Sequence, residues 1–204
     1  MQRLYRDDLA NLAALDQGRV HIFENVFTPQ ECDQICHSGD GVVNVASTGY
    51  EPGEFSDLRQ SKTRWIHGGD GTTDWVFERL RTVVLSANAT MKFDLCDLNY
   101  LQFTEYDVSY SGHYDYHVDF GTGPSLMFRK LTVIVQLTDP ADYDGCELFV
   151  GTAINTRASL MEVPVCKARG CVLVFPSFLV HRVSPITRGM RRSLVGWVEG
   201  PPYR

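Results

Sequence analysis

Two histidines and one aspartate have the residue types and spacing of a metal site. His117 and Asp119 lie two residues apart in the run YHVDF, and His181 follows much later in the run FLVHRV. On a β-strand, residues i and i+2 point to the same face, so one ion could bind both His117 and Asp119. Two histidines and one carboxylate form the facial ligand set of non-haem Fe(II), which leaves coordination positions open for a cosubstrate and for dioxygen. These three residues therefore predict iron-dependent oxygen chemistry.

A second pair with the same spacing lies just upstream. His113 and Asp115 repeat the His-x-Asp pattern with the same strand parity as His117 and Asp119. A single pair of this kind arises often by chance, and a lone histidine near an apolar run, such as His181, is more often packed than metal-bound. The residues by themselves do not decide which pair would bind the metal.

The wider pattern resembles the prolyl 4-hydroxylase type of Fe(II)/2-oxoglutarate-dependent oxygenase. The resemblance covers residues 98–200, with a weaker match over 20–66. In that family a tyrosine stands three residues before the metal-binding histidine, and here Tyr114 stands three residues before His117. The resemblance therefore selects the downstream pair. The pattern comprises Tyr106, Gly112, Tyr114, His117, Asp119, an apolar strand ending in Phe175-Pro176-Ser177, His181 and Arg191.

The resemblance also implies a binding site for 2-oxoglutarate. A guanidinium can hold the distal carboxylate of this cosubstrate with two parallel hydrogen bonds, and Arg191 stands at the family's distance after the distal histidine. Strand alternation puts Ser193, a further donor, on the same face and Arg192 on the other, although a register shift of one residue would exchange the two arginines. Tyr106 and Gln136 are further candidate cosubstrate contacts, and both also fit ordinary packing inside a barrel.

The implied cofactors are Fe(II), 2-oxoglutarate and dioxygen, with ascorbate dependence as a family expectation. Halogenation is disfavoured, because halogenating relatives replace the carboxylate ligand by a small residue and Asp119 is present. The run Gly145-Cys146-Glu147 departs from the Gly-Gly-Glu usual in relatives, so a thiol stands where the family has no side chain.

Three residues are candidate substrate contacts, and the substrate class stays open. Arg64 and Trp65 could lie at the mouth of the site, although an exposed arginine beside a packed tryptophan fits them as well. Tyr114 also fits packing that orients His117. The leading hypothesis is hydroxylation of a peptidyl proline or another protein side chain. The alternatives are a hydroxylase or desaturase of a small metabolite, a cupin-like metal-binding barrel without oxygen chemistry, and, ranked last, nucleic-acid demethylation.

Composition places the chain among ordinary globular enzymes. It has 204 residues, of which 44% are hydrophobic and 22% charged, and a formal net charge of −6. An acidic total disfavours binding to a phosphate backbone, so we expect no nucleic-acid partner. Without a long apolar stretch or a signal peptide, we expect a soluble, cytoplasmic protein with no membrane contact. The six cysteines form no Cys-x-x-Cys pair, which favours reduced thiols.

The first half of the chain predicts two helices and a supporting strand. Thr28 and Glu31 form a capping-box signature before a helix that runs to about Ser38. Periodic apolar residues predict a second helix over residues 72–89. Between them we expect a long loop over residues 40–57 and a strand over 59–66, and residues 1–18 could form a further short helix.

The second half predicts a mainly β fold, a double-stranded β-helix (jelly-roll) barrel buttressed by the N-terminal helices. In residues 98–106, Leu101 and Phe103 alternate with polar or amphipathic residues, and residues 130–138 repeat this pattern. A polar inner face is expected for a barrel interior that holds a site. About eight short strands with turn signals between them fit this architecture. We expect one of these turns over residues 139–145 and another marked by Pro185 and Gly189, before Arg191. We expect one domain over 1–204, with support in 1–97 and the barrel core in 98–200.

Overall fold

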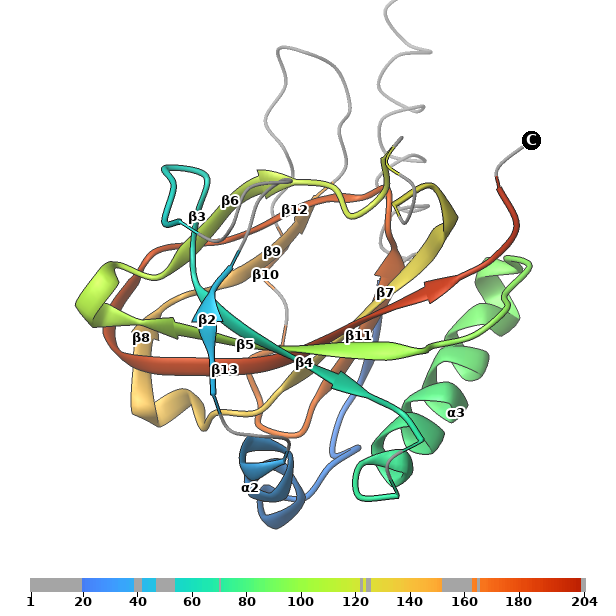
Figure 1. The fold of residues 1–204 in the computed structure, drawn as a ribbon, viewed down its shortest axis with the longest axis horizontal. Helices are drawn as coiled ribbons and strands as arrows, with labels where there is room; N and C mark the ends of the chain where they lie inside the picture. Colours follow the sequence, from blue (N-terminus) through green and yellow to red (C-terminus); the bar gives the residue numbers. More distant parts are fainter. Residues whose placement is uncertain are drawn as a thin grey trace, which may run out of the picture.

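Two antiparallel sheets form most of the structure (Figure 1). The computed structural model describes residues 20–38, 42–46, 54–69, 71–121, 123, 126–151, 163–164 and 166–202. The predicted helix over 1–18 and much of the predicted loop over 40–57 lie outside these residues. The predicted fold class, mainly β with N-terminal helices, is confirmed.

The larger sheet contains eight strands in the order β1-β11-β7-β13-β5-β4-β2, and β8 pairs with β13 beside this path. Its strands are β1 (His21–Phe23), β2 (Asn44–Val45), β4 (Lys62–His67), β5 (Tyr100–Asp107), β7 (Arg129–Gln136), β8 (Tyr143–Gly145), β11 (Val172–Pro176) and β13 (Ile186–Glu199).

The smaller sheet contains five strands in the order β10-β9-β12-β6-β3. Its strands are β3 (Arg59–Gln60), β6 (His113–His117), β9 (Leu148–Gly151), β10 (Val163–Pro164) and β12 (Val180–Val183). Short 3₁₀ turns at Val108–Tyr110, Leu126–Phe128 and Pro140–Asp142 lead into or out of these strands.

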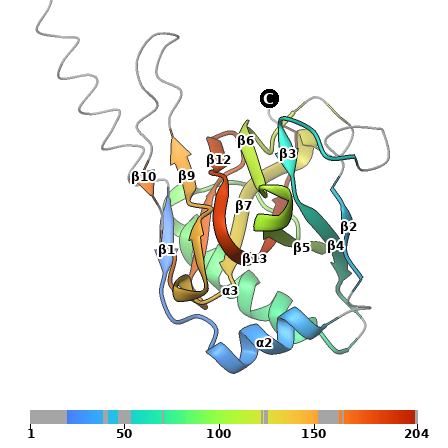
Figure 2. The ribbon, with the colours of Figure 1, turned by 90° about the vertical axis from the view of Figure 1, so that its left-hand side faces the viewer.

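Two helices support the larger sheet (Figures 1 and 2). Helix α2 (Pro29–His37) begins with the predicted capping box, in which Thr28 accepts from the Glu31 N–H and the Glu31 carboxylate accepts from the Thr28 N–H. Helix α3 (Asp74–Met91) ends at Lys92, which has left-handed backbone torsions. Both bury an apolar face in one cluster with the outer face of the sheet.

The alternation predicted for β5 and β7 is confirmed and separates two environments. Leu101 and Phe103 face the helices, as do Leu131, Val133 and Val135. The opposite faces carry Gln102, Thr104, Thr132 and Gln136, all buried between the two sheets. The sequence periodicity therefore places one apolar cluster on the outside of the larger sheet and these polar residues between the sheets, where they lie beside a second apolar cluster that includes Tyr106 and Ile134.

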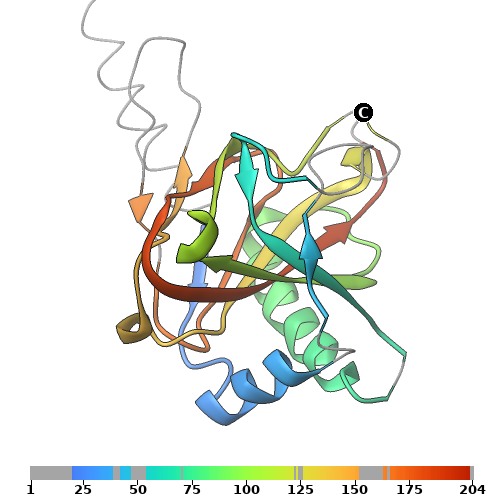
Figure 3. The ribbon, with the colours of Figure 1, turned by 60° about the vertical axis from the view of Figure 1, so that its left-hand side comes forward.

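Three predicted boundaries are corrected by the structure. The strand expected over 59–66 is interrupted at Ser61, so β3 belongs to the smaller sheet and β4 to the larger one. The turn expected at Gly189 lies inside β13, which first pairs with β8 and then runs between β5 and β7. Figure 3 shows the dark red β13 curving before it crosses the sheet. The turn expected over 139–145 ends in β8.

Candidate active site

His117, Asp119 and His181 come together between the two sheets. The Nε2 atom of His117 lies 4.0 Å from Asp119 Oδ1, and Nε2 of His181 lies 3.3 Å from Asp119 Oδ2. One potential ligand atom from each residue lies within 4.8 Å of the others, so a single metal ion could bind all three.

Two neighbouring strands and one short segment position these ligands. His117 ends β6 and lies directly opposite His181 of β12 in the antiparallel ladder. Asp119 lies just beyond β6, so the predicted sharing of one strand face is wrong in detail. Its N–H donates to the Ser177 carbonyl at 2.9 Å, and its Oδ2 accepts from Thr132 Oγ1 at 2.8 Å. These bonds turn the carboxylate toward the histidines.

The second nitrogen of each histidine is held by a backbone carbonyl. Nδ1 of His117 lies 2.7 Å from the Asp115 oxygen, and Nδ1 of His181 lies 2.9 Å from the Leu179 oxygen. A carbonyl only accepts, so each Nδ1 carries a proton, and the neutral form of each ring would present its Nε2 lone pair to a bound cation. Tyr114 stacks on the His117 ring with centroids 3.5 Å apart and further fixes its orientation, as the sequence suggested.

Burial and mutual charge set the protonation of the cluster. Burial, together with the neighbouring His181, lowers the pKa of His117 to about 3. For Asp119, burial alone would raise the pKa, but His181, His117 and Thr132 hold it well below its usual range. For His181, burial lowers the pKa but the Asp119 carboxylate outweighs it, so the net shift is upward. Near neutral pH the cluster therefore offers an ionised carboxylate and a neutral His117 to a cation.

The upstream pair is engaged elsewhere. Nδ1 of His113 contacts the Ser111 oxygen at 2.8 Å, and its Nε2 contacts the Asp57 oxygen at 3.1 Å. Asp115 is exposed and accepts the Tyr116 N–H. The structure thus brings together the pair that the family resemblance selected.

Arg191 lies in the same interior, on β13. It is 2% exposed, and its Nε and Nη2 donate to Gln136 Oε1 at 3.2 and 2.8 Å. Its Nη1 is buried and has no hydrogen-bond partner among the described residues. Arg192, by contrast, points outward and pairs with Glu105 at 2.9 Å. The structure therefore has the strand register that the alternation predicted.

The other predicted cosubstrate residues surround this guanidinium. It lies 5.6 Å from the centre of the Tyr106 ring, and the buried Ser193 pairs with Gln136 in the ladder. Cys146 is also buried here, with a left-handed φ of 55°, and burial raises the pKa of its thiol to about 11. Its thiol is thus neutral and fills space beside Arg191.

Comparison with known proteins agrees with this geometry. The sequence model described as "2OG-Fe(II) oxygenase superfamily" matches residues 101–199, which contain all three metal-ligand candidates. Residues 101–199 thus carry the sequence pattern of the 2OG-Fe(II) oxygenase superfamily. A PKHD-type hydroxylase of Gloeothece citriformis is 37% identical over 48% of this chain and 42% of the relative. The chain spans about half the length of the first curated relatives it matches.

Solved structures share the fold at low sequence identity. A Pseudomonas putida prolyl-4-hydroxylase superposes with a TM-score of 0.69 and 21% identity, covering 89% of this chain and 92% of that one. A Trichoplax adhaerens prolyl hydroxylase, solved with a peptide fragment of hypoxia inducible factor, gives a TM-score of 0.66 and 19% identity over 97% and 92%. Among the residues that the structure describes, neither helix is long and apolar enough to cross a bilayer.

The residues of this interior fit the two groups that the superfamily name implies. The two imidazole nitrogens and one carboxylate match the ligand preference of Fe(II). The buried Nη1 of Arg191, which has no partner among the described residues, is the kind of donor that a bound carboxylate satisfies. On β7, Thr132 bonds Asp119 at the metal end of the interior, and Gln136 bonds Arg191 at the other end. The two residues are four positions, or about 13 Å, apart along the strand.

The predicted substrate contacts separate onto two faces of β4. Arg64 is buried on the helix side, where its guanidinium lies 3.6 Å from the Phe103 ring centre and donates to the Cys36 carbonyl at 2.9 Å. This corrects the suggested substrate role of Arg64. Trp65 is 48% exposed and lies on the interior face, with its ring 6.0 Å from that of Trp197. Because neighbours on a strand point oppositely, only one of the two could face the site.

Sequence reasoning missed two residues of the site. Thr132, which orients Asp119, was visible only as one polar position on the inner face of β7. Arg59 is 7% exposed and donates to Gln102 Oε1 at 3.0 Å, on the interior side of β5. Arg59 points inward because the strand is interrupted between β3 and β4, and no local sequence pattern predicts this interruption.

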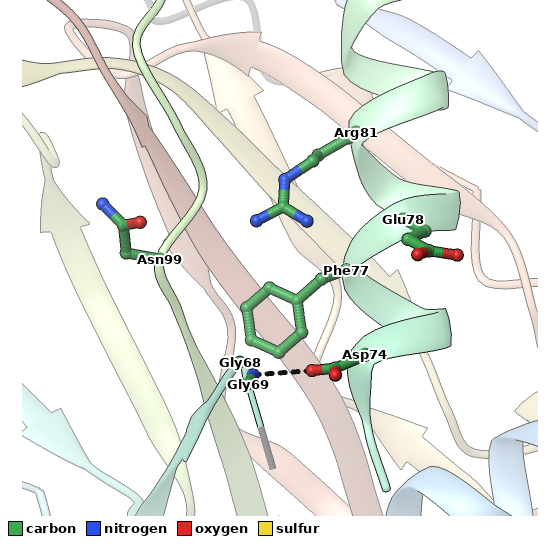
Figure 4. A pocket seen from close by; sticks show the side chains of 7 residues that line it. All are labelled: Gly68, Gly69, Asp74, Phe77, Glu78, Arg81 and Asn99. Atoms are coloured by element: carbon green, nitrogen blue, oxygen red, sulfur yellow. Dashed lines mark hydrogen bonds between the residues drawn. The ribbon is translucent and has the colours of Figure 1, made fainter. Parts of the chain in front are cut away.

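A cavity of about 360 Å³ lies elsewhere, at the first turns of α3 (Figure 4). Asp74 accepts the Gly69 N–H at its edge, and Arg81 pairs with Asp97. None of the lining residues belongs to the metal cluster, so this cavity is separate from the candidate active site.

Proposed function

We propose that this chain is an Fe(II)- and 2-oxoglutarate-dependent hydroxylase that oxidises an unactivated C–H group of a peptidyl proline, another protein side chain or a small metabolite. The observation that carries the proposal is one interior with two complementary features. The His117, Asp119 and His181 cluster suits Fe(II), and the buried Nη1 of Arg191 suits a carboxylate. When bound, Fe(II) and 2-oxoglutarate supply an oxidant by coupling cosubstrate decarboxylation to the reduction of dioxygen.

The residues of the chain have distinct tasks in this proposal. Arg191 holds the distal carboxylate of the cosubstrate through Nη1, while Gln136 fixes the guanidinium through its other two donors. Ser193 and Tyr106 supply hydroxyl groups beside it. Only these three protein ligands would bind the metal, so coordination positions would remain for the cosubstrate and for dioxygen.

The surrounding packing keeps the reaction positioned and dry. Asp119 and His181 are buried, at 7% and 4% exposure, and Thr132 is completely buried. Ligand orientation is therefore set by hydrogen bonds inside the protein instead of by water, as a preorganised site requires.

The likeness to prolyl hydroxylases supports a peptidyl substrate. A second substrate class, a small metabolite bearing a charged group, is favoured by Arg59, a buried cation close to the metal cluster.

Anaerobic titration with Fe(II) and 2-oxoglutarate tests the proposal directly. We expect a visible charge-transfer band that requires both components, followed by succinate release when air is admitted. His117→Ala and Asp119→Ala should abolish both signals, whereas His113→Ala and Asp115→Ala are the matched controls and should retain them. Folded, iron-loaded protein without the band would refute the cosubstrate assignment and favour a cupin-like metal site.

A further inference from the structure

Cys146, between β8 and β9, has an unusual backbone conformation for a residue with a side chain. Its φ is +55°, in the left-handed region, and it follows Gly145, whose φ is +74°. Its N–H donates to the Pro185 carbonyl at 3.2 Å, so the approach to β13 holds this conformation. Glycine adopts the left-handed region freely, whereas a Cβ makes it unfavourable. A side chain at this position therefore has a conformational cost, and we expect the thiol to have a role that offsets it.

The Cys146 side chain lies in the interior between the sheets, beside Arg191. It is 1% exposed and belongs to the apolar cluster that contains Tyr106 and Tyr143. Tyr106 pairs with Arg191 in the ladder of β5 and β13, and the Arg191 guanidinium lies 5.6 Å from its ring centre. Burial raises the pKa of the Cys146 thiol and of the Tyr143 phenol, and the nearby Arg191 charge acts in the opposite direction on both. The thiol thus forms part of the wall around the guanidinium.

The neighbours of Arg191 leave its charge free to bind a ligand. Nε and Nη2 donate to Gln136 Oε1, and the buried Nη1 has no partner among the described residues. The titratable groups that act most on Arg191 are the Cys146 thiol and the phenols of Tyr143 and Tyr106, and none of them is a carboxylate. Because burial keeps the thiol protonated near neutral pH, the guanidinium remains a free cation for a ligand carboxylate.

The metal cluster and Arg191 are both held in place, so the length between them is fixed. Thr132 donates to Asp119 at 2.8 Å, and Gln136, four positions further along β7, accepts from Arg191 at 2.8 Å. A 2-oxo diacid that reaches both ends must match this length. A longer chain has to bend sideways next to the guanidinium, where the Cys146 side chain occupies space.

We propose that the Cys146 side chain restricts the length of the cosubstrate: it leaves room at Arg191 for the two methylenes of 2-oxoglutarate and excludes a 2-oxo diacid with a third methylene. The proposal rests on the proposed function and assigns Cys146 as a residue that determines cosubstrate specificity. One methylene in a closed pocket changes affinity by about 10–200-fold. Cys146→Gly removes one carbon and one sulfur atom, which is more space than one added methylene needs.

Anaerobic titration of the charge-transfer band compares three 2-oxo diacids on the Fe(II)-loaded protein. 2-Oxoglutarate is the reference, 2-oxoadipate has one methylene more, and oxaloacetate has one methylene fewer. All three carry the same 2-oxo acid group, so the band measures the binding of each without turnover. In the unaltered protein we expect 2-oxoglutarate to bind at least about tenfold more tightly than either of the others.

Variants of Cys146 test the side chain itself. Cys146→Gly should lower the dissociation constant of 2-oxoadipate at least about tenfold relative to that of 2-oxoglutarate. It should leave oxaloacetate as weak as before, because it opens space without bringing Arg191 closer to the metal cluster. Cys146→Ala, which removes only the sulfur, should give a smaller gain. Cys146→Ser, which keeps a side chain of similar size, should keep the preference for 2-oxoglutarate.

Cys171→Ala is the matched control. Cys171 is a completely buried thiol of the same apolar cluster, and it is not among the groups that act most on Arg191. Its loss should leave the ratio of the dissociation constants of 2-oxoadipate and 2-oxoglutarate unchanged. A general packing defect would weaken the binding of both acids alike, so this ratio distinguishes a specific role of Cys146 from a merely structural one.

The outcomes separate the two proposals. A missing charge-transfer band with 2-oxoglutarate in the unaltered protein overturns the proposed function. With a normal band, the role of Cys146 alone is overturned if 2-oxoadipate binds the unaltered protein as tightly as 2-oxoglutarate does. It is also overturned if neither Cys146→Gly nor Cys146→Ala changes the ratio, or if Cys171→Ala changes it equally.

Discussion

At the scale of single residues, the two adjacent arginines of β13 have opposite environments. Arg191 is buried against Gln136, and Arg192 is half-buried in an ion pair with Glu105. Removing a buried charge-assisted contact loses about 1.5–3 kcal/mol, whereas a surface pair contributes about 0–1 kcal/mol. We therefore expect Arg191→Ala to raise the dissociation constant of 2-oxoglutarate by about 10–100-fold, and Arg192→Ala to change it less than threefold. Anaerobic titration of the charge-transfer band measures both, and equal effects would contradict the assignment of Arg191.

Thr132 gives a second test at this scale. Its hydroxyl donates to Asp119 Oδ2 at 2.8 Å and lies 3.0 Å from Ser177 Oγ. Thr132→Val keeps the shape but removes the donor, and loss of such an outer hydrogen bond weakens metal binding by about 10–100-fold. Competition with a chelator would measure the Fe(II) affinity. Thr63→Val, at a buried threonine of β4 in the same sheet, is the control and should leave the Fe(II) affinity unchanged. If both variants lose affinity equally, Thr132 has no specific role.

At the scale of elements, the bend of β13 brings Arg191 into the interior. Gly189 has a φ of +71°, and an added Cβ would collide with the Asp142 carbonyl. We expect Gly189→Ala to lower the free energy of unfolding by about 3 kcal/mol, because both strain and the clash oppose the alanine. Urea unfolding measures this. Gly68→Ala, whose Cβ would lie 3.7 Å from Phe77 at an ordinary φ, is the control and should change stability by less than about 0.5 kcal/mol.

The elements also show how far the sequence could predict the site. Strand alternation placed Arg191 inside and Arg192 outside, because this depends only on local geometry. The same rule shows that Arg64 and Trp65 cannot share a face, and applying it would have limited the substrate contacts to one of the two. The structure shows that Arg64 is the one that points away from the site. The sequence predicted a turn at Gly189, but this glycine has a positive φ inside the long strand β13. The conformation depends on the pairing of β13 with β8, which the local sequence does not reveal.

Long-range contacts account for what the sequence could not reveal. Arg59 reaches the interior because β3 pairs with β6 of the other sheet, a partner far along the chain. Asp119 is turned toward the histidines by Ser177 and Thr132, which no spacing rule connects to it. Local periodicity predicted the faces of the strands, and the tertiary contacts decided which polar residues meet.

At the scale of the whole molecule, Glu147 ties together three segments. Its Oε1 accepts from Lys167 at 2.8 Å and its Oε2 from Ser184 Oγ at 2.6 Å, so it connects the strand region before β9 with the approaches to β11 and β13. Partial burial would raise the pKa of Glu147, but these two hydrogen bonds outweigh it and lower the pKa to about 2. The folded state thus holds the ionised form more strongly than the unfolded chain does.

The sign of the resulting pH dependence follows from linkage. A carboxyl whose pKa is lowered on folding stabilises the protein fully above its ordinary value of 4.5, and this contribution is lost as the pH falls toward about 2. Because Glu147 and Lys167 are partly exposed, with side chains at 33% and 35%, solvent screening limits the contribution to about 1 kcal/mol. Glu147→Gln should therefore be about 1 kcal/mol less stable at pH 7, and the difference should shrink toward zero near pH 2. Urea unfolding at pH 7, 5 and 3 measures it. Asp144→Asn, which breaks the fully exposed pair with Arg188, is the control and should change the stability less. If the stability difference between Glu147→Gln and the unaltered protein persisted at low pH, packing and not charge would stabilise this junction.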